Sequence, residues 1–197
     1  MSLATPRARK YLAGTSQDLH NLLTISLESA LAARMASEDW HVEPMENIVE
    51  IKQDEFVLLT VSSYHFRMLV LLHFSAKNDA LNYVASALKQ PPESITSNGC
   101  YDYLAELGNQ FCGEIKRIVG TKYSHLGMST PKRLSNSSLP YVHDLKTTTA
   151  THVRAIRDGK DVFVASIYLC VDEDFDFQVD INLAMSQQVE ASTLELF

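Results

Sequence analysis

Four residues spaced by turns of a helix offer the clearest chemistry in this 197-residue sequence. Helical geometry would place on one face Asp102, Glu106, Asn109 and Gly113. A carboxylate can pair with a cation, and a neutral carboxamide can donate and accept hydrogen bonds and so orient a water molecule. For any single acid or amide, the simpler interpretation is the solvated face of a core helix. Gly113 argues against that interpretation, because a glycine in an exposed helix interior costs about 1 kcal/mol relative to alanine.

The segment that contains these residues predicts a helix from Tyr101 to Val119, with Gly120 as a left-handed C-terminal cap. Its buried face, opposite the four residues, would comprise Leu104, Leu107, Phe111, Ile115 and Ile118. Cys112 falls at the border of the two faces with no base nearby in the sequence, so packing is a better role for its thiol than nucleophilic attack.

This spacing resembles the D/S-x3-E-x2-N-x21-P signature of the CheC/CheX/FliY family of chemotaxis phosphatases. The four signature positions are matched by Asp102, Glu106, Asn109 and Pro131. A random chain of this length would match with a probability on the order of one in several hundred. The stretch from Glu106 to Lys116 also resembles the family's E-L-x-N-x-x-x-G-x-x-K wording.

The resemblance implies a phosphatase that removes the phosphoryl group from the aspartate of a phosphorylated CheY-like response regulator. Asn109 would orient the attacking water, and Glu106 would dock on the regulator's active-site lysine. Asp102 and Gly113 would lie against the partner, although an acid that favours the helix macrodipole is the simpler role for Asp102. Pro131 would fix the loop before the next strand. The chain would hold no metal or cofactor of its own, because the family's regulators bring the Mg²⁺.

Members of the CheC type carry two such motifs, whereas this chain carries one. In the first predicted helix, Glu28 is followed three residues later by Leu31 instead of asparagine. The chain therefore resembles single-site CheX, whose family fold is an α/β sandwich that dimerises through sheet edges. That resemblance implies a homodimer.

The patterning elsewhere predicts an α/β (α+β) sandwich in which two long helices and a shorter one pack on a largely antiparallel sheet. The order of the elements resembles a weak duplication of a helix-plus-strands unit. Thr15 or Ser16 would cap the first helix, and Asp158-Gly159-Lys160 would form a hairpin turn. Helices are predicted over Thr15–Ala36, Asn78–Gln90 and Tyr101–Val119, and strands over Asn47–Gln53, Phe56–Ser62, Phe66–Ser75, Thr147–Arg157 and Asp161–Val171.

Charge divides the chain into a neutral body and an acidic end. Residues 1–171 carry 17 basic and 17 acidic side chains, whereas residues 172–197 carry seven acids and no Lys or Arg. We expect an N-terminal extension over 1–14, a CheX-like domain over 15–171 and an acidic tail over 172–197. Apolar and polar residues alternate from Phe175 to Met185, which predicts an extra strand at the start of the tail.

Several classes of function find no support. Nucleic-acid binding needs clustered Lys and Arg, and the longest apolar run, Met68 to Phe74, is too short to insert across a membrane. The three cysteines and seven histidines lack the spacing of a disulfide framework or a metal site, so we expect no metal and a cytoplasmic location. The sequence also lacks a G-x-S-x-G elbow and a phosphate-binding P-loop.

Two alternatives remain open. The same helix could serve a non-catalytic module that binds a response regulator or another signalling partner without turnover. An assembly protein whose acidic tail binds a basic partner is the other alternative. Deletion of residues 172–197 would separate this last idea from the first two.

Overall fold

The computed structural model describes residues 6–34, 40–46, 51–77, 79–143, 145, 147–172 and 175–186, with the backbone alone for 6–14 and 143. The helices are α1 (Pro6–Ala32), α2 (Asp79–Leu88), α3 (Ser97–Gly120) and α4 (Leu139–His143), with short 3-10 turns at Pro92–Ser94 and Asn136–Ser138. The strands are β1 (His41–Met45), β2 (Glu55–Ser62), β3 (Phe66–Phe74), β4 (Gly127–Met128), β5 (Lys132–Ser135), β6 (Thr149–Arg157) and β7 (Lys160–Val171).

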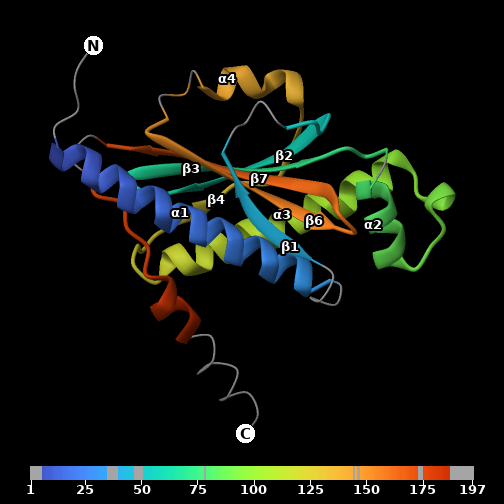
Figure 1. Ribbon diagram of the computed structural model, residues 1–197, viewed down its shortest axis with the longest axis horizontal. Helices are drawn as coiled ribbons and strands as arrows, with labels where there is room; N and C mark the ends of the chain where they lie inside the picture. Colours follow the sequence, from blue (N-terminus) through green and yellow to red (C-terminus); the bar gives the residue numbers. More distant parts are fainter. Residues whose placement is uncertain are drawn as a thin grey trace, which may run out of the picture.

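One antiparallel sheet organises the molecule, in the order β1-β6-β7-β3-β2-β4, with β5 also paired to β2. The two long helices, α1 and α3, cross one face of this sheet, and α4 covers part of the other (Figure 1). The shorter α2 joins the same core as α1 and α3. This arrangement confirms the expected α+β class and the expected packing of helices on a largely antiparallel sheet.

The main core lies between the helices and the sheet because the helical apolar stripes face inward. On α1 the fully buried apolar residues are Leu19, Leu22, Leu23, Leu27 and Leu31. They pack with the inward-facing side chains of β2, β3, β6 and β7 in one continuous cluster. Central strand β7 is buried on both faces from Val162 to Leu169. Such burial explains why its sequence is an apolar run interrupted by Ser166, instead of an alternation of apolar and polar residues.

The second face of the sheet holds a smaller apolar cluster beneath α4 and a buried polar group. Ser166 Oγ lies 3.1 Å from His73 Nε2 and 2.8 Å from His152 Nδ1. Burial, with a smaller effect of neighbouring His152, lowers the pKa of His73 to about 3. His73 is therefore a neutral core histidine with a hydrogen-bond partner.

Edge strand β1 corrects the predicted first strand. The strand predicted over 47–53 is wrong for Ile51–Gln53, which have no strand structure, and 47–50 lie outside the described residues. The strand lies earlier, at His41–Met45, and contains Pro44. Proline lacks an amide donor, but in the part of the chain that the structure describes β1 pairs on one side only, with β6, so the sheet tolerates Pro44 there.

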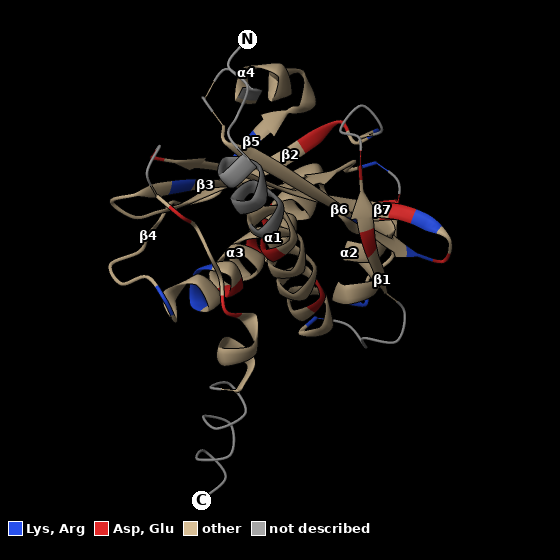
Figure 2. Ribbon diagram, turned by 60° about the vertical axis from the view of Figure 1, so that its left-hand side comes forward, with Lys and Arg blue, Asp and Glu red and all other residues tan. Residues whose placement is uncertain are grey.

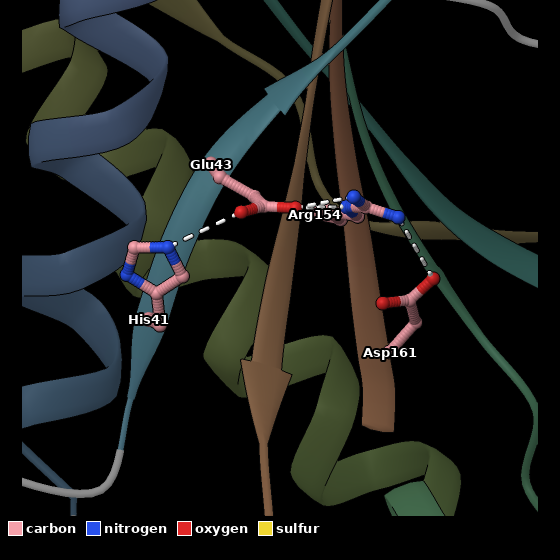
Figure 3. A network of polar contacts seen from close by, with 4 residues as sticks. All are labelled: His41, Glu43, Arg154 and Asp161. Atoms are coloured by element: carbon pink, nitrogen blue, oxygen red, sulfur yellow. Dashed lines mark hydrogen bonds and ion pairs between the residues drawn. The ribbon is translucent and has the colours of Figure 1, made fainter. Parts of the chain in front are cut away.

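Arg154 on β6 links β1 to the body of the sheet (Figure 3). It lies opposite Glu43 in the ladder, and its Nε donates to Glu43 Oε1 at 2.6 Å. Its Nη1 lies 3.8 Å from Asp161 Oδ2, and His41 Nε2 lies 3.2 Å from Glu43 Oε2. The hydrogen bond from Arg154 is the main cause that lowers the pKa of the Glu43 carboxyl.

The start of the acidic tail is packed on the helical layer, and the predicted strand is absent from residues 175–186. Residues 175–180 form an irregular extended segment, and a helical turn follows at 181–186. The alternation survives as alternating burial: Phe177 is buried between exposed Asp176 and Gln178. The Tyr123 hydroxyl donates to the Gln178 carbonyl and accepts from the Gln178 amide, both at 3.0 Å. The period of two in the sequence therefore reflects an extended segment with one buried side. The segment is not a strand, because helices present no free backbone groups for it to pair with.

The beginning of α1 also differs from the expectation. The helix starts at Pro6, so Thr15 and Ser16 lie inside it and the predicted cap is wrong. The Thr15 hydroxyl instead donates to the carbonyl of Phe177 at 3.1 Å, which joins α1 to the tail segment.

Among the described residues, no helix combines the length and the apolar character of a membrane span. Figure 2 shows Lys and Arg spread over several elements of the chain.

Candidate functional site

Helix α3 carries the signature residues, and local interactions set both of its ends. Thr96 caps the helix, because its Oγ1 accepts from the amide of Gly99 at 3.1 Å. At the other end, Thr121 keeps right-handed helical angles and its hydroxyl donates to the carbonyl of Ile118 at 2.8 Å. The left-handed cap predicted at Gly120 is therefore wrong, since α3 runs through Gly120 and a threonine side chain satisfies a terminal carbonyl.

The apolar face of α3 confirms the prediction, and all five of its predicted residues are fully buried. A glycine that the sequence analysis did not use brings the helix close to the sheet. A Cβ on Gly108 would lie 3.3 Å from Val57 Cγ1 and 3.4 Å from Leu59 Cδ1. The signal was present, because Gly108 follows Leu107 on the apolar side. Close contact with β2 thus fixes the depth of α3 and the placement of its outer face.

On the outer face, the structure brings together Glu106 and Asn109. Asn109 Nδ2 donates to Glu106 Oε2 at 3.3 Å. An ionised carboxylate can only accept, so this contact turns the amide nitrogen of Asn109 toward Glu106 and leaves Asn109 Oδ1 as an acceptor. The Glu106 side chain is 55% exposed. The pair can therefore offer a carboxylate and a carbonyl oxygen to a molecule that docks on α3.

Asp102 and Gly113 flank this pair on the same face. Asp102 is exposed and lies beyond the first turn of α3, which contains no acidic residue. Since the macrodipole acts mainly within that turn, the dipole role considered for Asp102 is wrong. A Cβ on Gly113 would meet no atom of the described residues within 4 Å. No contact with the described residues therefore explains the glycine, and its role in partner binding stays a prediction.

Arg34, directly after α1, also reaches this face, and the sequence analysis did not find it. Its Nη2 lies 3.9 Å from Glu106 Oε1, and its Nε donates to Gln110 Oε1 at 2.8 Å. Its guanidinium carbon lies 4.6 Å from the centroid of the Tyr103 ring. Arg34 is far from α3 in sequence, so no spacing within the motif could have indicated it.

Pro131 lies where the signature led us to expect it, directly before strand β5, which pairs with β2. Two residues later, Arg133 forms a two-pronged contact with Glu55, in which Nη2 lies 2.7 Å from Oε1 and 2.8 Å from Oε2. The same guanidinium lies 5.0 Å from the ring centroid of Tyr101 on α3. These contacts join the strand after Pro131 to the start of the site helix.

Other candidate chemistry on and around α3 is weaker. Burial raises the pKa of the Cys112 thiol to about 12, so it is protonated at neutral pH and packs in the core. Within the described part of the chain, no group of three or more His, Cys, Asp or Glu side chains could hold a metal ion. The residues that combine exposure with complementary polar groups are thus Glu106 and Asn109.

Comparison of sequences gives no family, because no protein-family model and no curated protein matches the chain. Comparison of structures finds solved chemotaxis proteins with the same fold. A chain of the CheX-CheY-BeF₃-Mg²⁺ complex from Borrelia burgdorferi superposes with a TM-score of 0.61 at 13% identity, covering 76% of this chain and 96% of that one. For CheX from Vibrio vulnificus the TM-score is 0.57 at 18% identity, with 76% and 95% covered.

A CheC-like superfamily protein from Shewanella sp. PV-4 superposes with a TM-score of 0.56 at 16% identity. This match covers 78% of this chain and 97% of that one. In each case nearly the whole neighbour is matched, so the likeness concerns the complete fold instead of one motif. The chain therefore has the fold of the CheX and CheC-like chemotaxis proteins.

Proposed function

We propose that this protein is a CheX-like phosphatase that hydrolyses the aspartyl phosphate of a CheY-like response regulator. The observation that carries the proposal is the Glu106–Asn109 pair on the exposed face of α3. It stands in the signature spacing, on a fold shared with CheX. The fold alone would not suffice, because one fold can host unrelated functions.

Asn109 is proposed to orient the water that attacks phosphorus. Its Nδ2 is engaged by Glu106, so Oδ1 can accept a hydrogen bond from a water placed in line with the bond to the regulator's aspartate. The new bond joins water oxygen to phosphorus, the bond to the aspartate breaks, and the products are inorganic phosphate and a free carboxylate. A neutral amide suits this role, since it does not repel the phosphoryl oxygens.

Glu106 is proposed to dock the regulator by pairing with its active-site lysine. The carboxylate is more than half exposed, so it can accept a second cation from a partner. Asp102 and Gly113 would lie in the same contact, where the space above Gly113 admits a close approach. Charge neutralisation at the transition state would come from the Mg²⁺ and lysine of the regulator, so the chain needs no metal or cofactor of its own.

The proposal extends to assembly and location. We propose a cytoplasmic homodimer formed through a sheet edge, for which β1 is a candidate because, among the described residues, it pairs with β6 alone. Sedimentation of the purified protein would test the dimer.

The decisive experiment is the decay of a phosphorylated CheY-like regulator in Mg²⁺, with and without the protein. We expect the wild type to accelerate decay, and Asn109→Ala and Glu106→Ala to lose most of the acceleration. The matched control is Asn21→Ala on α1, which also removes one member of an exposed polar pair, here with Gln17 at 3.0 Å. This control should retain wild-type activity.

The competing function, a docking module without turnover, predicts a different result. Such a module would bind the regulator through α3 and leave its decay unchanged. If the wild type binds a native regulator but does not accelerate its decay, Asn109 loses its catalytic role. The tail-scaffold alternative needs a gentler test than deletion of 172–197, because Phe177 belongs to the core. Substitution of exposed Asp172 and Asp176 would test the charge and keep the packing.

A further inference from the structure

Arg34 is a cation that the protein itself places beside Glu106. Its Nε donates to Gln110 Oε1 at 2.8 Å, and its guanidinium carbon lies 4.6 Å from the centroid of the Tyr103 ring. The Arg34 side chain is 15% exposed, whereas that of Glu106 is 55% exposed. Arg34 is therefore held by α3 independently of Glu106, and the flexible member of the pair is the glutamate.

The distance between the two charges shows what Arg34 can do. Nη2 and Oε1 are 3.9 Å apart, which is wider than the roughly 2.7–2.9 Å of a charge-assisted hydrogen bond. At this separation the fixed cation attracts the carboxylate without using up its hydrogen-bonding capacity. The other oxygen, Oε2, accepts from Asn109. Glu106 thus lies between two groups that face opposite oxygens.

We infer that Arg34 is a positioning residue of the α3 site, which orients Glu106 and, through it, the carboxamide of Asn109. With Oε1 drawn toward Arg34, Oε2 faces Asn109 Nδ2 and holds the amide with its oxygen free. The consequence for turnover rests on the proposed function. The orientation of Asn109 does not, because it belongs to the free protein.

Removal of the guanidinium would leave Glu106 as a long, exposed side chain with several rotamers. Asn109 Nδ2 would then lose its fixed hydrogen-bond acceptor, and the side-chain amide of Asn109 could rotate. Misplacement of a positioning group lowers the rate of the bound complex, and we expect a loss of on the order of tenfold for Arg34→Gln. The charge of Glu106 remains available to a partner lysine, so the regulator concentration at half-saturation should change by no more than about twofold.

The test combines two readouts on the full chain. In the free protein, NMR of the Asn109 side-chain amide reports whether one of its protons is hydrogen bonded. Arg34→Gln should shift these resonances toward those of Glu106→Ala, which has no acceptor at that position. The matched control is Arg133→Gln, which also removes a guanidinium paired with a carboxylate and stacked on a tyrosine of α3. This control should leave the Asn109 resonances unchanged.

Single-turnover decay of a phosphorylated CheY-like regulator gives the second readout. Arg34→Gln should lower the rate at saturation and add nothing in a Glu106→Ala background, as expected for a residue that acts through Glu106. If Arg34→Gln does not fold, Gln110→Ala replaces it, because this change removes the acceptor of Arg34 Nε.

The outcomes separate the two proposals. Asn109 resonances that stay at their wild-type positions in Arg34→Gln, or in Gln110→Ala if Arg34→Gln does not fold, overturn the inference, whatever happens to turnover. A change confined to half-saturation also overturns it, since Arg34 would then be a docking contact. If the resonances shift as expected but the wild type does not accelerate decay, the positioning role stands and the proposed function fails.

Discussion

The sheet and helix α3 both carry acidic side chains held by arginine, and the two regions hold them differently. On the sheet, Glu43 accepts from Arg154 at 2.6 Å and also contacts His41, and the same arginine faces Asp161. On α3, Glu106 lies 3.9 Å from Arg34 and accepts from an amide at 3.3 Å. The Glu43 side chain is 29% exposed and that of Glu106 is 55% exposed.

This difference separates a polar group that completes the fold from one that is available to a partner. Glu43 uses both carboxylate oxygens within its own sheet and fastens an edge strand. Glu106 is oriented by its neighbours and keeps accessible surface. A side chain whose hydrogen bonds are all internal has little to offer another molecule, whereas one that is oriented but open can bind without a large ordering cost.

The largest effect should come from making the same substitution, glutamate to glutamine, in each of the two regions. Glu106→Gln should lower turnover of a phosphorylated regulator by roughly 100-fold, since a neutral amide cannot form an ion pair with a lysine, and leave thermal stability nearly unchanged. Glu43→Gln should show the reverse, with wild-type turnover and a lower melting temperature. Calorimetry and decay assays on the same two proteins measure both quantities. If Glu43→Gln lost turnover and Glu106→Gln kept it, the assignment of Glu43 to the fold and of Glu106 to the site would be wrong.

The buried histidine of the sheet predicts a pH dependence. The pKa of folded His73 is about 3, below its usual value, because burial disfavours the charged form. The neutral histidine therefore supports the fold above about pH 6.5, and this contribution is lost as the pH falls toward 3. Stability should fall by roughly 1 kcal/mol per pH unit in this window, measured by urea unfolding. His73→Gln should flatten the slope.

The control for this measurement is His125→Asn. His125 is exposed and has a positive φ of 60°, which asparagine tolerates. It should keep the wild-type slope. An equal slope in His73→Gln and the wild type would mean that His73 takes up its proton in the folded protein.

Two glycines on opposite faces of α3 allow the packed face of the helix to be compared with its exposed face. Gly113→Ala should stabilise the protein by about 0.5–1 kcal/mol, because nothing lies within 4 Å of the added methyl and alanine is the better helix former. Gly108→Ala should gain less or lose stability, because its methyl meets Val57 at 3.3 Å. Chemical unfolding of the matched pair measures the difference. A larger gain at Gly108 would contradict the close contact of α3 with β2.

The smallest effect concerns the acid limb of the stability profile. The hydrogen bond from Arg154 lowers the pKa of folded Glu43, so the ionised form supports the fold above the unfolded value of about 4.3. This support is lost as the pH falls through the lower folded value. Wild type should therefore lose slightly more stability than Glu43→Gln between pH 5 and pH 3. A matched change at exposed Glu46 should leave the loss as in the wild type.

Periodicity was sufficient to predict the framework of this molecule. The apolar stripe of α3, the β2–β3 pair and the turn at Asp158-Gly159 follow from spacing and from residues with positive φ, of 52° and 71°. The signature spacing also predicted that Glu106 and Asn109 share one face of the helix, where they are hydrogen bonded to each other. These features are local, and the physical rules that govern them act within a few residues.

The remaining features depend on contacts between distant segments. Arg34 reaches Gln110 across 76 positions, and no pattern near either residue encodes that meeting. Strand β1 escaped prediction because it is short and contains Pro44, which only its edge position permits. Residues 175–180 showed the period of a strand, yet they contact side chains of α1, of β3 and of Tyr123 instead of pairing with a strand edge. Tertiary contacts therefore decided that this extended segment is not a strand.

The buried position of Phe177 limits how early the protein can fold during its synthesis. This ring enters the core near Tyr123 and Phe66, and the carbonyl of the same residue accepts from Thr15 on the first helix, 162 positions earlier. During synthesis α1, β3 and α3 all leave the ribosome before Phe177 does. The core can therefore close only after residue 177 has been made, and a nascent chain halted before it would expose apolar surface to chaperones.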